Sequence, residues 1–378
     1  MIICKNCGHL NPEGSKFCEN CGALIEETRA HQSVVSQGER QVEQETQSSK
    51  LSPKKPNNKS LIIGIIIIVL LVLAAGFDYM KNHNGDETRT ENTKNSTDKN
   101  NKHDEPKSNQ SSSDADVKTI LSSNLSGIKG DTTAYYYNLD DDTTASYGDA
   151  KTPQRAASDI KLYIMAAAFQ KIADGDISLN DRYELTNDDK VGGTGVTQNM
   201  QAGESLTYRD LIDYMITKSD NTAANIITKE VGGMSAVNDE IEKLGLSDNT
   251  KMERMLMDQD ALAEGKDNKT TSYDLAIFMK KLYRHDVVSA KYDKEMMSVL
   301  SNTSNHSKIP AEINTNVVDV YNKTGEYADY GVENDAAILK RDNKAFVLVV
   351  MSQNGDSDEQ KDAMGSLGKE LTQEILGN

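Results

Sequence analysis

A serine and a lysine three positions apart can form a nucleophile and its base. On a helix this spacing places both side chains on one face, where a neutral lysine amine can accept the serine proton. Ser158 and Lys161 have this spacing at the start of residues 158–173, the most apolar helix that the sequence predicts. Lysine is rarely buried without a partner or a function, so this pair is the candidate nucleophile and base. The alternative is that Ser158 caps the helix and Lys161 extends to solvent.

Other kinds of catalytic site have little support in this sequence. Residues 115–378 contain two histidines, and the chain has no Gly-x-Ser-x-Gly motif, so a Ser-His-Asp hydrolase is weakly supported. The chain also lacks a His-Glu-x-x-His motif for a metalloprotease and a Gly-x-x-x-x-Gly-Lys phosphate loop. The Ser-x-x-Lys spacing recurs at Ser52, Ser96, Ser126 and Ser366. Because those four pairs lie where Ser and Lys are ordinary surface residues, the spacing alone is weak evidence.

Two further motifs follow Ser158 in the chain. Ser-Asp-Asn at 219–221 comes after an amphipathic segment and begins another predicted helix. A second Ser-Asp-Asn, starting at Ser247, follows a glycine and is typical of a turn. Lys-Thr-Gly at 323–325 occurs once in the chain and ends a predicted strand, where its glycine would let a substrate approach the backbone closely.

With these motifs, residues 115–378 resemble the superfamily of class A β-lactamases and D-alanyl-D-alanine peptidases, the penicillin-recognising serine hydrolases. The order Ser-x-x-Lys, Ser-Asp-Asn, Lys-Thr-Gly, with starts separated by 61 and 104 residues, matches the class A members. The resemblance implies a β-lactamase/transpeptidase-like α+β fold, with an antiparallel sheet packed against helices and a helical subdomain. It also implies β-lactams or peptidoglycan-like peptides as substrates and no cofactor for catalysis.

The resemblance assigns catalytic roles to three side chains. Ser158 would be the nucleophile that attacks a lactam or peptide carbonyl. Lys161 would be its base, with a pKa lowered by burial and by the nearby cation Lys323. Ser219 would relay a proton to the leaving nitrogen.

The same resemblance assigns the residues that bind substrate. Asn221 would hydrogen-bond the side-chain amide of the substrate, and Lys323 and Thr324 would hold its carboxylate. The oxyanion would lie between the backbone N–H groups of Ser158 and Glu326, the residue that follows Gly325. A weaker match is Gly193-Thr194-Gly195, at the position of a loop that lines the site in this family.

One segment departs from the family pattern. Class A β-lactamases carry an Arg-x-Glu-x-x-x-Asn loop whose Glu activates the water that releases the acyl-enzyme. In this chain the segment runs from Arg254 to Asp260, with Leu256 at the Glu position, Asp260 at the Asn position and Asp258 nearby. Leucine cannot accept a proton, so we expect acylation to survive and deacylation to slow. The alternative is structural: Met255, Leu256 and Met257 pack inward and leave the aspartates in solvent.

Periodicity predicts the elements that must position these motifs. Residues 132–139 and 143–147 read as a β-hairpin, and residues 162–169 are apolar on every side, which indicates a central buried helix. Further helices are predicted at 208–218, 222–230, 234–244, 272–283 and 358–376. Strands are predicted at 317–324, 336–340 and 345–351, with a turn at 341–343. Strands at both ends with helices between them predict one α+β domain, a single sheet that both ends of the domain complete.

The chain has four cysteines, all at its N-terminus. Cys4, Cys7, Cys18 and Cys21 form two Cys-x-x-Cys pairs, each followed by glycine, which is the pattern of a tetrahedral structural zinc site. A redox Cys-x-x-Cys pair is the alternative, but it would need a surrounding βαβ pattern that is absent. Residues 1–25 resemble the zinc ribbons at the N-termini of many bacterial membrane proteins.

Residues 61–77 are a run of 17 uncharged, mostly aliphatic residues. Lysines at 50–59 precede the run and Asp78 follows it, so the positive-inside rule places the N-terminus in the cytoplasm and the C-terminal part outside. We expect an uncleaved transmembrane helix; a core helix or a signal peptide is the alternative. The polar segments at 26–60 and 78–114 are predicted to be a flexible linker and a disordered stalk.

The distribution of charge and cysteine along the chain agrees with an N-terminus in the cytoplasm and a C-terminal part outside it. The chain carries a net charge of −17, almost all of it in residues 115–378, so nucleic acid is not an expected partner. Residues 115–378 lack cysteine, as suits an exported domain. The sequence thus predicts a membrane-anchored extracytoplasmic serine hydrolase whose zinc ribbon has an unknown cytosolic partner. The alternatives are a penicillin-binding sensor that acylates without turnover and an inactive binding module; the stalk argues against a sensor, because it would transmit conformation poorly.

Overall fold

The computed structural model describes residues 2–3, 10–11 and 112–377. The chain divides into two units, residues 1–107 and 108–378. In the first unit, strands β1 (Ile2–Ile3) and β2 (Leu10–Asn11) pair in antiparallel register. The four cysteines, the linker predicted at 26–60 and the membrane segment predicted at 61–77 lie outside the described residues. The same holds for most of the predicted stalk.

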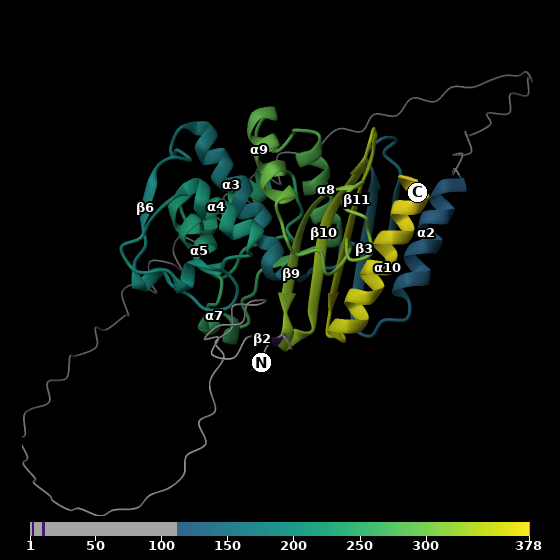
Figure 1. The fold of residues 1–378 in the computed structure, drawn as a ribbon, viewed down its shortest axis with the longest axis horizontal. Coiled ribbons are helices and arrows are strands. Elements are labelled where there is room, and N and C mark those ends of the chain that lie inside the picture. The colour runs from purple at the N-terminus through teal and green to yellow at the C-terminus, as the bar shows by residue number, and fades with distance from the viewer. Residues whose placement is uncertain (1, 4–9, 12–111, 378) are drawn as a thin grey trace, which may run out of the picture. The chain divides into compact units, whose positions relative to one another are not determined.

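The second unit is built on a five-stranded antiparallel sheet with the order β4-β3-β11-β10-β9 (Figure 1). Its strands are β3 (Asp131–Asn138), β4 (Thr144–Tyr147), β9 (Asp319–Tyr327), β10 (Val332–Arg341) and β11 (Lys344–Gln353). The β3–β4 hairpin from the start of the domain pairs with β11 from its end. The predicted α+β fold, with one sheet completed by both ends of the domain, is confirmed.

The central strand β11 explains why the sheet needs cover on both faces. Phe346, Leu348 and Val350 pack in one buried cluster, whereas Val347 and Val349 pack in another. Because successive side chains of a strand point to opposite faces, this uninterrupted apolar run requires a core on each side. The helices α2 (Ser112–Leu125) and α10 (Ser357–Ile375) lie side by side over one face, and the helical part of the domain covers the other (Figure 1).

The helical part of the domain surrounds α3 (Ile160–Asp174). Every residue of this helix from Ile160 through Phe169 is buried. The other helices are α4 (Tyr208–Thr217), α5 (Asn221–Glu230), α6 (Met234–Lys243), α7 (Gln259–Ala263), α8 (Ser272–Tyr283) and α9 (Ala290–Ser301). The helices α4, α5, α6 and α9 contact α3, so the apolar run at 162–169 is the central helix that the sequence predicts.

Two short strand pairs and several turns complete the domain. Strand β5 (Gln154–Arg155) pairs with β8 (Lys269–Thr270), and β6 (Arg182–Glu184) pairs with β7 (Ser205–Thr207). A single 3₁₀ turn, Ala157–Asp159, joins β5 to α3, so the helix begins two residues later than the sequence predicts. The predictions did not include α2, α7 or α9. Within residues 112–377, no helix is long and apolar enough to cross a membrane.

Candidate active site

Ser158 lies at the junction between β5 and α3. It belongs to the 3₁₀ turn rather than to the helix proper, and Ala157 before it adopts a left-handed φ of 45°. Such a conformation is strained for a residue with a Cβ atom, and strain of this kind concentrates at functional sites. Ser158 does not cap α3, because the helix begins after Asp159 and no side chain makes the N-cap hydrogen bond. The capping alternative is therefore wrong.

Lys161 lies one turn into α3 and points into the domain. Its side chain is fully buried, so the alternative in which it extends to solvent is also wrong. The Nζ atom lies 3.1 Å from Ser158 Oγ, 2.5 Å from the Ser219 carbonyl oxygen and 2.8 Å from Asn221 Oδ1. Burial lowers the Lys161 pKa well below its usual value, and the cation Lys323 lowers it further. A neutral amine here has a lone pair that can accept the Ser158 proton.

Ser219 links Lys161 to the second buried lysine. Its Oγ lies 3.3 Å from Lys161 Nζ and 3.0 Å from Lys323 Nζ. Ser219 occupies the tight connection between α4 and α5, where its φ of 50° is again left-handed. Lys323 comes from β9 and is almost completely buried, and this burial lowers its pKa. The three sequence motifs thus meet at one hydroxyl that can pass a proton between two amines.

Gly325 allows β9 to lie directly against the turn that carries Ser158. A Cβ atom at this position would lie 2.9 Å from the Ala156 carbonyl oxygen and 3.3 Å from the Ala157 Cβ. Any larger residue would push the strand away from the nucleophile. The requirement for glycine in Lys-Thr-Gly is therefore this close packing of strand and turn.

Asp220 organises the wall opposite β9, and the sequence analysis gave it no role of its own. Its side chain is fully buried and accepts from the backbone N–H of Ala223, which caps α5. The other carboxylate oxygen accepts from the N–H groups of Val196 and Thr197, each at 2.7 Å. Gly195 passes so close that a Cβ there would lie 2.3 Å from Asp220 Cγ. The predicted site-lining loop is therefore held against the Ser-Asp-Asn motif.

These segments enclose a cavity of about 250 Å³. Residues from every predicted segment line it, among them Ser158, Gly193, Asn221, Leu256 and Glu326. The structure thus brings Ser158, Lys161, Ser219, Asn221 and Lys323 into one connected cluster, with Thr324 and Gly325 beside it on β9. The Ser158 side chain lies in the wall of this cavity.

A family model described as the Beta-lactamase enzyme family matches residues 113–375. The chain belongs to this family. A β-lactamase from Bacillus licheniformis is 28% identical over 54% of the chain and 66% of its own length, so the chain spans slightly less than two thirds of that relative. The β-lactamase PSE-4 from Pseudomonas aeruginosa is 26% identical over 61% of the chain and 81% of its own length.

Solved β-lactamase structures share the fold of the second unit. A β-lactamase from Sphaerobacter thermophilus superposes with a TM-score of 0.63 at 27% identity, over 68% of the chain and 96% of that protein. The structure of PBP-A superposes with a TM-score of 0.62 at 23% identity, over 68% of the chain and 95% of that protein. The β-lactamase/transpeptidase-like α+β fold follows from these matches.

In this β-lactamase-family domain, the segment after Arg254 forms one wall of the cavity. The Leu256 side chain is buried, and its backbone is held on both sides by Asn225, which accepts from the Leu256 N–H at 2.9 Å and donates to its carbonyl at 3.0 Å. Met255 and Leu256 pack inward, as the structural alternative predicts. Met257 does not, because it is 39% exposed and adopts a left-handed φ of 65°. Asp258 caps α7 by accepting from Ala261 N–H.

A cluster of charged side chains around the buried Lys308 supports β9. Lys308 is fully buried and pairs with Glu326 at 2.9 Å and Glu333 at 2.8 Å. Burial alone would raise the pKa of Glu326, but Lys308 and Lys323 together lower it to about 2. Burial raises the pKa of the neighbouring Asp335 to about 7. This cluster could not be predicted from the sequence, because the isolated Lys308 is not part of any recognisable motif.

Asp159 is a second residue that the motifs did not single out. It is fully buried between Ser158 and α3, and neither carboxyl oxygen has a hydrogen-bond partner among the described residues. Burial raises its pKa to about 8 despite the nearby cations Lys323 and Lys308. Burial thus favours the protonated, uncharged form of Asp159 in the turn that carries the nucleophile.

The N-terminal cysteines are covered by a separate match. A zinc-ribbon domain model matches residues 3–25, a range that includes Cys4, Cys7, Cys18 and Cys21. This match indicates zinc binding, in agreement with the sequence prediction. The cysteine positions themselves lie outside the described residues, so the ligand geometry stays a prediction.

Proposed function

We propose that this protein forms an acyl-enzyme at Ser158 with β-lactams or with D-Ala-D-Ala-type peptides. The observation that carries the proposal is the fully buried Lys161, whose Nζ lies 3.1 Å from Ser158 Oγ and whose pKa is lowered by burial. A lysine in this state is a base rather than an ion-pair partner. The relatives named β-lactamases support β-lactams as the class of substrate.

The proposed reaction moves one proton through the cluster. Lys161 Nζ accepts the Ser158 Oγ proton while the oxygen attacks the carbonyl carbon, and the developing oxyanion lies at the backbone N–H groups of Ser158 and Glu326. The carbonyl C–N bond then breaks, and the Ser219 hydroxyl donates its proton to the leaving nitrogen. Ser219 regains a proton from Lys161, which lies 3.3 Å away. Lys323 and Thr324 hold the substrate carboxylate, and Asn221 binds its amide.

Deacylation is the step that this site supports poorly. Among the described residues that line the cavity, Glu326 alone carries a carboxylate. Its pKa of about 2 makes it a weak base, and it is already bound by Lys308 at 2.9 Å and by Asn305 at 3.1 Å. Leu256 has no proton acceptor. We therefore infer a long-lived acyl-enzyme, as a slow β-lactamase, a peptidase or a penicillin-binding sensor would form.

Labelling by a fluorescent penicillin tests the proposal. The full-length protein is incubated with the probe, the labelled peptide is identified by mass spectrometry, and loss of label is followed after the free probe is removed. We expect label on Ser158 that persists, and none in Ser158→Ala. Ser126→Ala, in an exposed Ser-x-x-Lys pair, is the control and should label like the wild type. Unlabelled wild type, or equal labelling of Ser158→Ala, would contradict the acyl-enzyme.

We further propose that the hydrolase domain is anchored to the membrane outside the cytoplasm, with the zinc ribbon on the cytoplasmic side. The support is in the sequence: 17 uncharged residues at 61–77, lysines before them, and no cysteine in residues 115–378. The four-cysteine ribbon would then lie in the reducing compartment, where thiolates stay free to bind zinc.

A further inference from the structure

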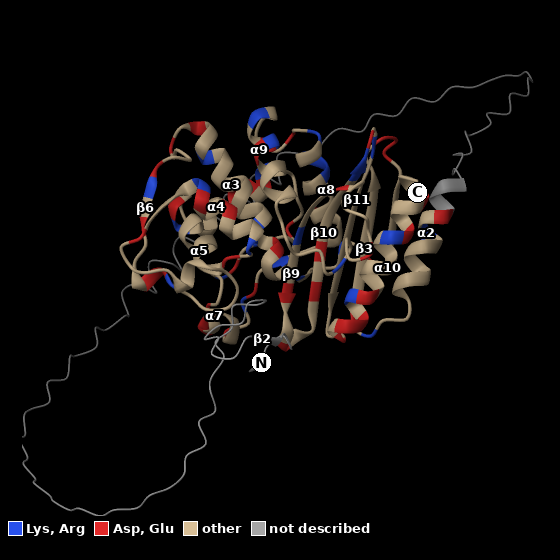
Figure 2. Ribbon diagram, in the orientation of Figure 1, with Lys and Arg blue, Asp and Glu red and all other residues tan. Residues whose placement is uncertain are grey.

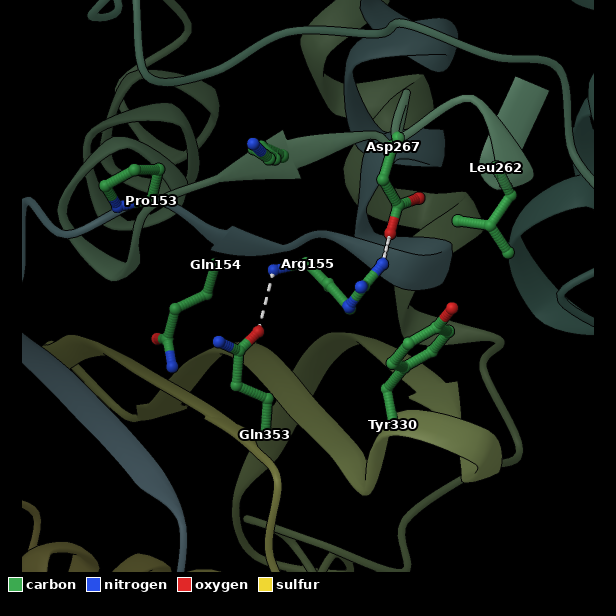
Figure 3. Close-up of a pocket in the computed structure, with 9 residues that line it drawn as sticks. Pro153, Gln154, Arg155, Leu262, Asp267, Tyr330 and Gln353 are labelled. Atoms are coloured by element: carbon green, nitrogen blue, oxygen red, sulfur yellow. Dashed lines mark hydrogen bonds and ion pairs between the residues drawn. The ribbon is translucent and has the colours of Figure 1, made fainter.

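A second cavity opens beside β5, the strand that leads into Ser158. Its volume is about 320 Å³, within the range of small-molecule sites. Figure 3 shows its polar wall, formed by Arg155 of β5, Asp267 before β8, Tyr330 after β9 and Gln353 of β11. None of its lining residues borders the cavity at Ser158. It is therefore a separate cavity rather than an extension of the active site.

Arg155 is held in place with part of its hydrogen-bonding capacity unused. Figure 3 shows its guanidinium between Asp267, with which one terminal nitrogen pairs, and the ring of Tyr330. The Cζ atom lies 3.6 Å from the centre of that ring, and the side chain is 27% exposed. No other described residue accepts from the guanidinium, so its remaining N–H groups are free. A fixed guanidinium with free donors suits a carboxylate or phosphate group.

Two more donors border the same cavity. Lys269 is exposed, and its ammonium contacts no acceptor within residues 112–377. Gln353 accepts from the Arg155 backbone N–H at 3.2 Å through Oε1, which leaves its NH₂ group to donate elsewhere. Asp267 is the acidic residue of the wall, and Arg254 also pairs with it, at 2.8 Å. The cavity wall thus carries two cationic side chains, Arg155 and Lys269, and one carboxylate, which is already paired with two arginines.

We propose that this cavity binds a small organic anion through a carboxylate or phosphate group. The free N–H groups of Arg155 and Gln353 and the ammonium of Lys269 are the donors, and Leu262 supplies an apolar wall for the rest of the molecule. The Arg155–Asp267 pair stays in place when the anion binds, because the ligand uses the donors that this pair leaves free.

The anion site is connected to the active site by a closed ring of five side chains. Arg155 and Arg254 both pair with Asp267, Arg254 lies 6.0 Å from the ring of Tyr327, and Tyr327 stacks edge-on against Tyr330 at 4.9 Å. Tyr330 in turn contacts the Arg155 guanidinium, which closes this ring of side chains. Arg254 and Tyr327 also line the Ser158 cavity. An anion that contacts Arg155 is therefore connected through this ring to two residues that line the active site.

Calorimetric titration of the full-length protein tests the binding site. Succinate and inorganic phosphate are the two probes, each added at constant ionic strength against chloride, and the tighter probe identifies carboxylate or phosphate as the preferred group. Lys269→Met should raise Kd about 10-fold, because it removes one charge-assisted hydrogen bond. Lys266→Met is the matched control: Lys266 is exposed three residues earlier, pairs with Glu264 and is not part of the wall. Its Kd should stay that of the wild type.

Arg155→Lys tests whether the planar guanidinium is required. The variant keeps the positive charge but loses the planar set of guanidinium N–H donors, so we expect weaker anion binding. Circular dichroism checks that the protein is still folded. Absence of saturable binding of both probes to the wild type would overturn the proposal. So would an equal loss of affinity in the Lys266 and Lys269 variants, because that result would show only diffuse attraction to positive charge.

The connection to the active site is tested by the rate at which fluorescent penicillin labels Ser158. Saturation with the tighter probe should change that rate at least 2-fold in the wild type, and the same concentration should have no effect in Lys269→Met. This part rests on the proposed acyl-enzyme, whereas the titration does not. Binding without a change in labelling would overturn the connection alone, and absence of labelling would overturn the proposed function while the titration still decides the anion site.

Discussion

At the scale of single residues, the unusual feature of the site is that two lysines are buried within reach of one hydroxyl. Lys161 and Lys323 both lie close to Ser219 Oγ, and burial lowers the pKa of each. The cation Lys323 also disfavours the protonated form of Lys161. The arrangement keeps a base next to Ser158 at pH values where an exposed lysine would be fully protonated.

Removing the charge of Lys323 should therefore change the pH dependence of acylation. In Lys323→Met the protonated form of Lys161 no longer faces a second cation, so its pKa rises and less neutral amine is present at a given pH. We expect the acidic limb of the acylation rate to move to higher pH by about 1 unit. The measurement is single-turnover labelling of Ser158 by penicillin across the acidic and neutral range.

Lys323→Arg is the control for this experiment, since it keeps a cation at the position. The acidic limb of its acylation rate should lie at the same pH as in the wild type. If the changed side-chain shape weakens substrate binding, the dependence of the rate on substrate concentration changes, but the pH of the acidic limb does not. An acidic limb at the same pH in Lys323→Met and the wild type would show that Lys323 does not set the pKa of Lys161.

At the scale of elements, the catalytic motifs are placed by tight connections. The 3₁₀ turn Ala157–Asp159 carries the nucleophile, the left-handed Ser219 links α4 to α5, and Gly325 lets β9 pack against the turn. The loop that begins at Arg254 is fixed through its backbone, by Asn225 on Leu256 and by the ion pair between Arg254 and Asp267. The Leu256 side chain is therefore free to be replaced without losing the anchors of the loop.

A glutamate at Leu256 should give this loop the base that it lacks. In Leu256→Glu a carboxylate would face the Ser158 cavity and could activate a water molecule against the acyl-enzyme, so we expect loss of penicillin label to speed up on the order of 100-fold. Leu256→Gln has nearly the same shape without a base and should keep the slow rate. Equal acceleration by both variants would mean that loop packing, rather than a missing proton acceptor, limits deacylation.

Some helices and strands could be predicted from the sequence, and others could not. Long segments such as α3, α8 and β11 were predictable, because the spacing of their apolar residues shows whether one face or all faces of the element are buried. The helices α2, α7 and α9 were not: α2 begins in a polar serine-rich stretch, and α7 is held mainly by the Asp258 cap. The positions of α2 and α9 follow from contacts with segments distant in the chain.

For the active site, the linear motifs identified the residues that contact one another through their side chains. They did not identify residues whose role depends on burial, such as Asp159 and Lys308, or on a backbone contact, such as Asn225. A charged residue has the same letter in the sequence whether it is fully buried or exposed. The pairing of β9 with β10 sets Glu326 opposite Glu333, and Lys308 pairs with both. Asp335 joins them by accepting from the Ile309 backbone N–H. Figure 2 shows acidic segments next to one another on these two strands.

At the scale of the whole molecule, the composition changes sharply along the chain. All four cysteines fall in the segment matched by the zinc-ribbon model, and the three catalytic motifs fall in the segment matched by the β-lactamase family. The uncharged run at 61–77 lies between the two matched segments. We expect this order if the run separates two compartments, because thiolates stay free to bind zinc in a reducing compartment and a domain without cysteine tolerates an oxidising one.

Deletion of residues 61–77 should therefore release the protein from membranes. A run of 17 uncharged residues is close to the length needed to cross the hydrocarbon core, and no other segment of the sequence offers such a run. The measurement is the share of penicillin-labelled protein that sediments with membranes after a high-salt wash. We expect the wild type in the pellet and the deletion variant in the supernatant, still labelled on Ser158. Deletion of residues 78–94, the same number of polar residues, is the matched control and should leave the protein in the pellet. If both deletion variants stayed with the membranes, attachment would have to come from another part of the chain.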